Sequence, residues 1–413
     1  MVKMKFKFSS QFVWQIIEKC LRMLSVSMTS ILITNQLGLE KFGSYSFIIN
    51  NLLIMLAFAN FGTANFVSSE AASCDARDSE VLGTFFYVRL FTSLVSSCVV
   101  YFAFLYLDYK INFLFFLFVV TLLLSSLDVF ENFNIGKERY VLNLKIKSII
   151  LLLGFIIRVY FSFYDFDLNF YLHVFFFEFI FSYLFIFVEV NNRFSINLRF
   201  NRIYLDKNLR NIVNLSATSV LALLTVRVDQ YLLKFMVGSV ELGIYNFLFG
   251  FINVSTFLPL AVFYTKLPIL SKSRELTLDH QKEHKIALRL FFFSGLVGSL
   301  VSFFVSSLLM IIYDFDQVFW FVCLTLSFLP LLTASSLYQV ILIMVYDYKG
   351  LGLMKVLLSA VLVVLIGPVL VKVIGVNGVS LSMIIALVTV EIFFIANVDE
   401  KLRAGYIRMK GLK

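Results

Sequence analysis

The stretch TVRVDQYLLKFMVGSVELGIYNF, residues 225–247, decides how the whole chain is interpreted. It begins in an apolar run of helical character, breaks at Gly238, and continues as a second apolar run after Gly243. Glycine adopts the backbone angles of tight turns at little cost, whereas side chains resist them. We therefore interpret the stretch as a joint between two long helices that breaks at Gly238 and turns through Gly243.

A second copy of this joint lies near the N-terminus. The segments QLGLEKFGSYSF (36–47) and MVGSVELGIYNF (236–247) carry the same residue at four matching positions, namely Gly38 and Gly238, Gly43 and Gly243, Tyr45 and Tyr245, and Phe47 and Phe247. Aromatic matches come easily in a chain with 50 phenylalanines, but paired glycines do not. The pattern therefore indicates an internal repeat of two similar halves.

The composition places most of the chain in a lipid bilayer. Hydrophobic residues make up 60% of the 413 residues, charged residues make up 15%, and the mean hydropathy is +0.90. A soluble domain carries roughly 25% charged residues. Apolar runs of about 20 residues are typical of membrane-spanning helices, whereas the strands of a membrane barrel alternate over about ten. We predict an all-α integral membrane protein.

The apolar runs predict about twelve transmembrane helices. They lie at 11–34, 43–64, 82–107, 112–131, 141–163, 168–190, 211–236, 243–265, 286–312, 317–344, 351–373 and 377–397.

Lysine and arginine gather at the N-terminus, in every second loop and in the C-terminal tail. The loop 191–210 is rich in them, whereas the opposite loops are nearly bare. The positive-inside rule then places both termini in the cytoplasm. The two glycine joints fall on the outer side, six spans apart. This predicts two six-helix lobes, 1–205 and 206–413, related by a parallel pseudo-two-fold repeat.

Ionisable residues inside the spans are the candidates for function. Each costs about 2.5–3.5 kcal/mol at the centre of a membrane helix, so it faces protein or a wet cavity rather than lipid. We expect several of them to line a wet cavity between the lobes. The candidates are Arg22, Arg89, Asp128, Arg158, Glu178, Arg227, Asp229 and Lys234.

The alternative is that these charges form packing pairs or reach the membrane interface. Glu18 and Arg22 are four residues apart and can pair along one helix. Asp229 points away from Arg227 and needs another partner. Lys19, Arg22 and Glu391 lie toward the cytoplasmic ends of their spans, where this alternative applies most.

Motifs for enzymatic chemistry are absent from the sequence. His280, Glu283 and His284 spell H-x-x-E-H, a zinc-enzyme pattern, but they lie in a short charged segment that suits a solvated linker helix. The sequence has no P-loop or nucleotide-binding fingerprint. We predict no metal, no cofactor and no enzymatic activity. The net charge of +9 follows the membrane topology and does not indicate nucleic acid.

The motifs together resemble those of a known family. They are QLGLEKFGSYSF, NLLIMLAFANFGTANFV, RVDQYLLKFMVGSVELGIYNF and IGVNGVSLS, the last near the final span. The chain resembles the Wzx-type polysaccharide flippases, which transport O-antigen or capsule repeat units, in the multidrug/oligosaccharidyl-lipid/polysaccharide exporter superfamily. The resemblance covers the whole chain. It implies two six-helix lobes around a V-shaped cavity in the bacterial inner membrane.

The resemblance also implies a function. An undecaprenyl-diphosphate-linked oligosaccharide would move from the cytoplasmic to the periplasmic leaflet by alternating access, coupled to a proton or sodium gradient. Membrane lipid, a polymerase and a chain-length protein would be its partners. Arg22, Arg89, Arg158, Arg227 and Lys234 would then line the substrate path, and Asp128, Glu178 and Asp229 would couple the ion. Two alternatives stay open, a multidrug or cation antiporter of the same superfamily and a membrane polysaccharide polymerase.

Overall fold

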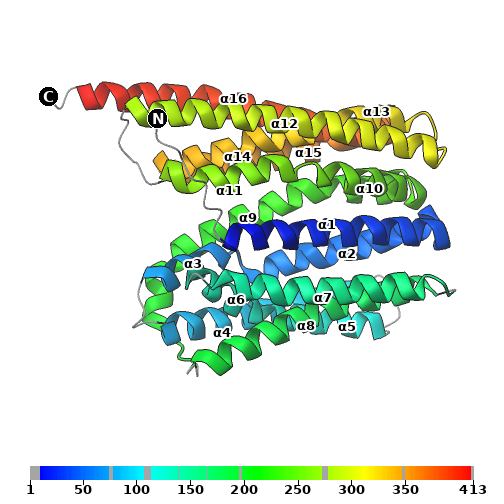
Figure 1. Cartoon of the computed structure of the whole chain (residues 1–413), viewed down its shortest axis with the longest axis horizontal. Helices are drawn as coiled ribbons and strands as arrows, with labels where there is room; N and C mark the ends of the chain where they lie inside the picture. Colours follow the sequence, from blue (N-terminus) through cyan, green and yellow to red (C-terminus); the bar gives the residue numbers. More distant parts are fainter. Residues whose placement is uncertain are drawn as a thin grey trace. The chain divides into compact units, whose positions relative to one another are not determined.

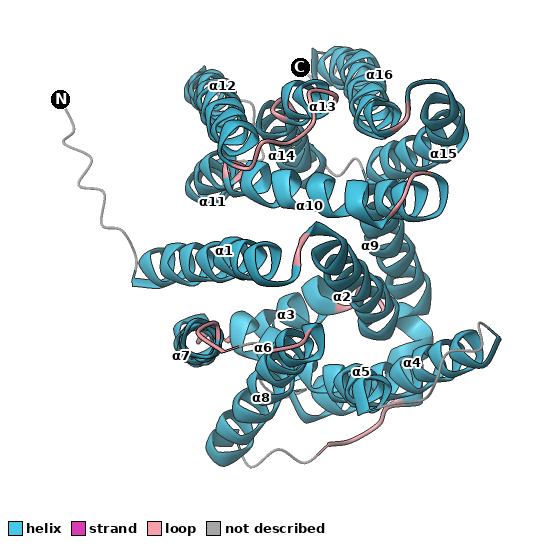
Figure 2. Cartoon of the chain, turned by 90° about the vertical axis from the view of Figure 1, so that its right-hand side faces the viewer, coloured by secondary structure: helices cyan, strands magenta, loops and turns pink. Residues whose placement is uncertain are grey.

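The computed structural model describes residues 10–73, 78–106, 113–137, 139–164, 166–194, 198–271, 278–346 and 349–410. The regular structure in these ranges is helical, without a strand (Figures 1 and 2). The first helices are α1 (Ser10–Leu37), α2 (Leu39–Asn60), α3 (Ala64–Ser73), α4 (Asp78–Tyr106), α5 (Phe113–Leu124), the short η2 (Ser125–Leu127), α6 (Asp128–Gly136), α7 (Tyr140–Phe161) and α8 (Leu168–Phe194). The others are α9 (Arg202–Met236), α10 (Ser239–Val254), α11 (Phe257–Ser271), α12 (Leu278–Ile312), α13 (Phe319–Leu326), α14 (Leu329–Tyr346), α15 (Lys349–Ile374) and α16 (Val376–Lys410).

Nine helical stretches within the described residues are long and apolar enough to cross a membrane. Each coincides with one of the twelve predicted spans. The other three predicted spans, 11–34, 141–163 and 211–236, form helices too, in α1, α7 and α9. Each of these three contains three charged residues, which lower its hydropathy. The helices with the weakest hydropathy therefore carry many of the candidate site residues.

The residues divide into two compact units, Met1–Leu223 and Leu224–Lys413, called here the N-terminal and C-terminal units. The division lies inside α9, whereas the predicted boundary at residue 205 lies near the beginning of that helix. Tyr204 and Ile212 of α9 pack into the core of the N-terminal unit, so the first turns of α9 belong with that unit. The assignment of 1–205 and 206–413 as lobes remains a prediction.

Both units contain the same sequence of continuous and interrupted spans. In each unit the second span is interrupted, between α2 and α3 and between α10 and α11. The fourth span is interrupted as well, at η2 between α5 and α6, and at residues 327–328 between α13 and α14. The third spans, α4 and α12, are continuous. This shared order supports the internal repeat seen in the glycine motif.

The glycine joint itself is shorter than the sequence suggested. Gly38 is the single residue between α1 and α2, and Gly238 follows Val237 between α9 and α10, with φ of 85° and 157°. Gly43 and Gly243, predicted to lie in the turns, are instead buried inside α2 and α10. One residue with a positive φ suffices to redirect the chain. The second glycine of each pair therefore serves helix packing, not the turn.

The interruptions have local causes in the sequence. Phe61 and Gly62 take positive φ angles of 48° and 56° and end α2. The second span of the C-terminal unit breaks at residues 255–256, and Pro259 lies in the first turn of α11. Proline is tolerated there because the first helical residues donate no internal hydrogen bond.

The core of the N-terminal unit lies beside its interrupted spans. Phe85 of α4 and Phe130 of α6 are fully buried there, together with Ile186 of α8. In the C-terminal unit Ala287 and Phe291 of α12 pack against Ala334 and Ile341 of α14. The equivalent spans thus form a core in each unit, and the polar residues described next are set among them.

Candidate functional site

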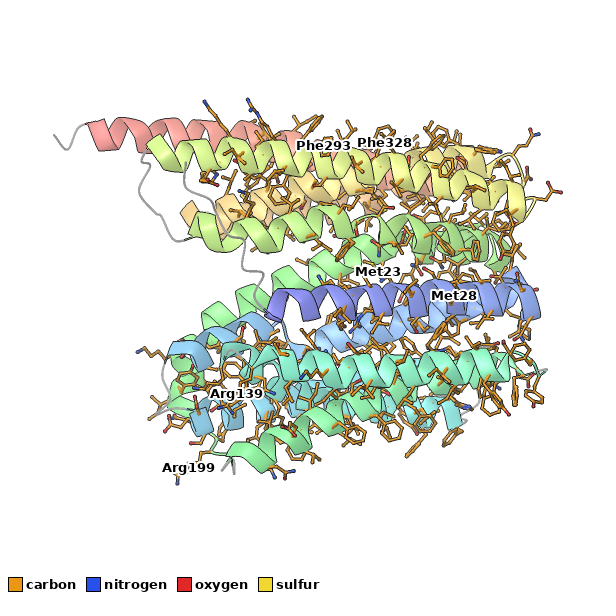
Figure 3. The ribbon with its side chains drawn as sticks, in the orientation of Figure 1. Met23, Met28, Arg139, Arg199, Phe293 and Phe328 are labelled. Atoms are coloured by element: carbon orange, nitrogen blue, oxygen red, sulfur yellow. The ribbon has the colours of Figure 1, made fainter. Side chains whose placement is uncertain are left out.

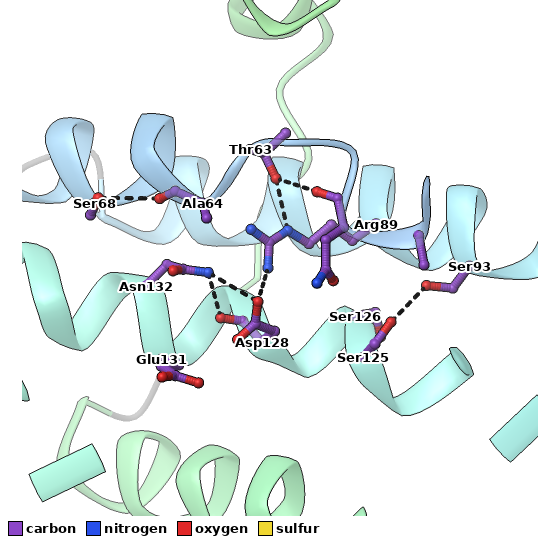
Figure 4. Close-up of polar contacts among 12 residues, drawn as sticks. Thr63, Ala64, Ser68, Arg89, Ser93, Ser125, Ser126, Asp128, Glu131 and Asn132 are labelled. Carbon is purple, nitrogen blue, oxygen red and sulfur yellow. Dashed lines mark hydrogen bonds and ion pairs between the residues drawn. The ribbon is translucent and has the colours of Figure 1, made fainter. Parts of the chain in front are cut away.

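Arg89 of α4 joins the two interrupted spans of the N-terminal unit (Figure 4). Its Nε donates to Thr63 Oγ1 over 2.8 Å, and its Nη1 donates to Asp128 Oδ2 over 3.2 Å. Thr63 directly precedes α3, and Asp128 begins α6. The Arg89 side chain is 0% exposed. A single guanidinium therefore links both helix breaks from the continuous helix between them.

Neighbouring side chains complete this link, which we call the Arg89 cluster (Thr63, Arg89, Asp128 and Asn132). Asn132 Nδ2 donates to Asp128 Oδ2 over 3.3 Å. One turn beyond Arg89, Thr92 Oγ1 donates to the carbonyl of Ala59 over 2.6 Å. Interrupted membrane helices leave backbone groups that lipid cannot satisfy. The cluster supplies part of the missing hydrogen bonding.

Arg158 and Glu178 form a second buried ion pair, between α7 and α8. Both terminal nitrogens of Arg158 donate to the carboxylate, over 2.8 and 2.7 Å, and Nη1 also donates to Ser25 Oγ of α1 over 3.1 Å. Arg158 is 2% exposed. Paired donors on one carboxylate form the strongest kind of side-chain ion pair. The three helices are held together by this group.

The Arg158–Glu178 pair depends on a glycine, and we predict that Gly154→Ala destabilises the protein. A Cβ at position 154 would lie 1.7 Å from Glu178 Oε1, so the carboxylate would have to move and its paired bonds would distort. Overpacking of this kind costs about 1–3 kcal/mol. Thermal unfolding of the purified protein measures the loss. Gly250→Ala is the control, since a Cβ there meets nothing within 4 Å, and an equal loss in both variants would contradict the prediction.

Residues of the 225–247 stretch form a third group, inside the C-terminal unit. The Tyr245 hydroxyl donates to Asp229 Oδ2 over 2.8 Å, so Asp229 does find a partner other than Arg227, as predicted. Asp229 is 1% exposed. Lys234 Nζ donates to Ser239 Oγ over 2.5 Å across the glycine joint.

Arg227 differs from the other candidate cations. Its Nε is buried and has no hydrogen-bond partner within the part of the chain that the structure describes. The same described residues provide no ion pair to its guanidinium. Arg22, by contrast, pairs with Glu18 as its spacing predicts. Arg227 therefore lacks the direct carboxylate partner that Arg22, Arg89 and Arg158 have.

The sequence interpretation missed a fourth group, the Lys355 cluster (Ser335, Ser336, Gln339, Lys355 and Glu391). Lys355 of α15 donates to Glu391 Oε1 of α16 over 2.8 Å and to Gln339 Oε1 of α14 over 2.5 Å. Glu391 is buried and paired with Lys355, which is one of the two arrangements that the alternative interpretation of the charges allowed. The sequence did contain a sign of this cluster, because Lys355 lies within the predicted span 351–373.

Two of the H-x-x-E-H residues, Glu283 and His284, take part in packing contacts. Glu283 accepts a bond from Lys266 over 3.2 Å, and His284 Nδ1 lies 3.3 Å from the Tyr338 hydroxyl. His280 has no described side-chain position. Glu283 and His284 thus connect α12 to α11 and α14.

Comparison with known structures identifies the fold. The Vibrio cholerae MATE transporter VcmN in its bent form is 12% identical, with a TM-score of 0.64 over 95% of this chain and 96% of that chain. An outward-facing multidrug resistance MATE family transporter of the MOP superfamily is 14% identical, with a TM-score of 0.66 over 95% and 94%. An inward-facing structure of such a transporter is 13% identical, with a TM-score of 0.63 over 97% and 96%. The chain therefore has the two-lobed fold of these transporters.

The sequence comparison identifies the family. Residues 7–274 match the family described as polysaccharide biosynthesis protein. No curated protein sequence matches the chain significantly. Together with the transporter fold, this match confirms the resemblance drawn from the sequence motifs. The chain is a multi-pass membrane protein that belongs to the polysaccharide biosynthesis protein family.

Proposed function

We propose that the chain is a flippase that moves an undecaprenyl-diphosphate-linked oligosaccharide from the cytoplasmic to the periplasmic leaflet. The observation that carries this proposal is a polysaccharide biosynthesis family match on a chain with the fold of a membrane exporter. A lipid-linked sugar is the intermediate of such a pathway that lies in the membrane. Its lipid tail stays in the bilayer, so the protein must provide a wet path only for the charged head.

The pairing of the candidate residues narrows the roles that we propose. Arg89 and Arg158 are held by carboxylates, whereas Arg227 has no ion pair among the described residues. A guanidinium offers forked donors that match phosphate oxygens. We assign the contact with the diphosphate first to Arg227. Asp229 bonds to a hydroxyl rather than to an arginine, so it suits proton or sodium coupling better than Asp128 or Glu178.

A multidrug antiporter is the second candidate, because the similar solved structures are multidrug transporters. An exporter of organic cations needs carboxylates that are free to face the drug. Asp128, Glu178 and Glu391 are each tied to a cation of this chain. This pairing favours an anionic cargo. The transporter family and fold also make a polymerase the weakest of the three functions.

Reconstitution into liposomes tests the proposed function. Vesicles carrying the protein and a lipid-diphosphate oligosaccharide are exposed to a sugar-oxidising reagent that cannot cross the membrane. The reagent alone oxidises only the sugar lipid of the outer leaflet. We expect the protein to move the sugar lipid of the inner leaflet outward, so that this protected half becomes oxidised as well. Arg227→Ala vesicles serve as the matched control. Full protection of the inner lipid, together with uptake of a cationic dye, would instead establish the antiporter.

We place the protein in the bacterial inner membrane with both termini in the cytoplasm. Arg139 and Arg199 support this placement, because both lie at the same end of the N-terminal unit (Figure 3). Both belong to predicted cytoplasmic loops, which are rich in basic residues. A polymerase and a chain-length protein would then act on the delivered sugar on the periplasmic side.

Cysteine labelling in intact cells tests the topology. In a variant without its four native cysteines, Phe200→Cys is expected to react with an impermeant thiol reagent only after permeabilisation, and Asp167→Cys is expected to react at once. Both positions are exposed, so access depends on the side of the membrane. Immediate labelling at position 200 would invert the proposed orientation.

A further inference from the structure

The Lys355 cluster lies between α14, α15 and α16 of the C-terminal unit, among helices that pack against one another. Three oxygens surround the ammonium of Lys355, at 2.5 Å from Gln339, 2.8 Å from Glu391 and 3.1 Å from Ser336. The ammonium also lies 5.6 Å from the centre of the Phe394 ring, within the range of a cation–π contact. An ammonium has three protons to donate, and each finds an acceptor.

The carboxylate of Glu391 is satisfied to the same degree. One oxygen accepts the Lys355 bond, and the other accepts bonds from Ser335 and Gln339. Glu391 and Gln339 are only 7% and 3% exposed. In the two buried arginine pairs one nitrogen stays without a partner, Nη2 of Arg89 and Nε of Arg158. The oxygens around Lys355 therefore satisfy every donor of its ammonium, whereas the oxygens around each of the two arginines leave one nitrogen without an acceptor.

We infer that Ser336, Gln339 and Glu391 form a binding site for a small monovalent cation, and that the chain's own Lys355 ammonium permanently occupies it. The site has the groups that bind a primary ammonium. They are the buried carboxylate of Glu391, the neutral oxygens of Ser336 and Gln339, and the aromatic ring of Phe394. Its occupant is attached to α15 and does not exchange with solution.

A site filled by Lys355 bears on ion coupling whichever cargo the protein carries. A carboxylate that holds a tethered cation has no vacancy for a sodium ion or proton during a transport cycle. We therefore expect Glu391 not to serve as the coupling group. The cluster instead fixes α14, α15 and α16 to one another, because each of the three helices contributes to it.

Chemical rescue tests the site. Lys355→Ala removes the atoms of n-propylammonium from a buried position, so this ion is the probe. We expect the variant to lose thermal stability and to regain most of the loss in Tm with added n-propylammonium, saturably. 1-Propanol and tetramethylammonium should not restore it, since the first lacks the charge and the second lacks N–H donors. The Tm of the unsubstituted protein should stay constant throughout.

Two further variants make the outcome decisive. Lys372→Ala removes an exposed lysine from the same helix and should respond to none of the additives. Lys355→Met with Glu391→Gln has neither charge, so it should be more stable than Lys355→Met alone and insensitive to n-propylammonium. If Lys355→Met is less stable than the double variant and Lys355→Ala is rescued, the site is established. Equal stability of these two variants, or no response of folded Lys355→Ala to n-propylammonium, would overturn it.

Discussion

Arg89→Ala is expected to remove most of the folded protein from the membrane. The substitution leaves Asp128 without its counter-charge inside the N-terminal unit and takes a donor from Thr63. Breaking one partner of a buried ion pair costs about 3–5 kcal/mol. That cost is a large part of the total stability of a typical protein. The measurement is the amount of folded protein in detergent extracts, followed by size-exclusion chromatography and thermal unfolding.

Two comparisons show whether the loss comes from the ion pair. Arg199→Ala removes an exposed arginine of the same unit, and surface substitutions of this kind change stability by only about 0.5 kcal/mol. Arg89→Met combined with Asp128→Asn removes both charges and should recover part of the loss. If the double variant is as unstable as Arg89→Ala, the hydrogen bond to Thr63 matters more than the ion pair.

Arg227→Ala is expected to abolish surface polysaccharide while the protein folds and reaches the membrane at its normal level. Arg227 has no ion pair among the described residues, so its removal leaves no carboxylate unpaired in the way that Arg89→Ala does. A diphosphate that leaves water loses strong hydration, and the guanidinium would offset part of that loss. Polysaccharide on the cell surface and protein in the membrane are measured in the same deletion strain.

The conservative variants separate binding from folding. Arg227→Lys keeps the positive charge but loses the forked donors of the guanidinium, so cells with this variant should retain part of their surface polysaccharide. Asp229→Asn should impair transport without preventing membrane insertion. Arg158→Ala should also abolish polysaccharide, but through loss of folded protein, because it leaves Glu178 unpaired. Normal polysaccharide in Arg227→Ala cells would remove Arg227 from the substrate path.

The sequence could predict local properties of the candidate site. The spacing of Glu18 and Arg22 determined their pairing, because residues four apart share one helix face. The position of Asp229, two residues from Arg227, indicated that it needed another partner. The sequence could not supply that partner, Tyr245, because it comes from the next helix across the glycine joint.

By itself, the sequence determined that the protein lies in a bilayer, where the nine apolar spans of the described residues run, and that its glycine joint occurs twice. These properties follow from apolar length and from local backbone angles, which depend on neighbouring residues. Only the tertiary structure decided which charged residues form ion pairs with one another. Arg89 and Asp128 are 39 residues apart, and Lys355 and Glu391 are 36 apart. Pairing across such distances in the sequence depends on which helices pack together. The hydropathy pattern cannot show this, because it is nearly the same for a charged residue that forms an ion pair and for one that contacts a substrate.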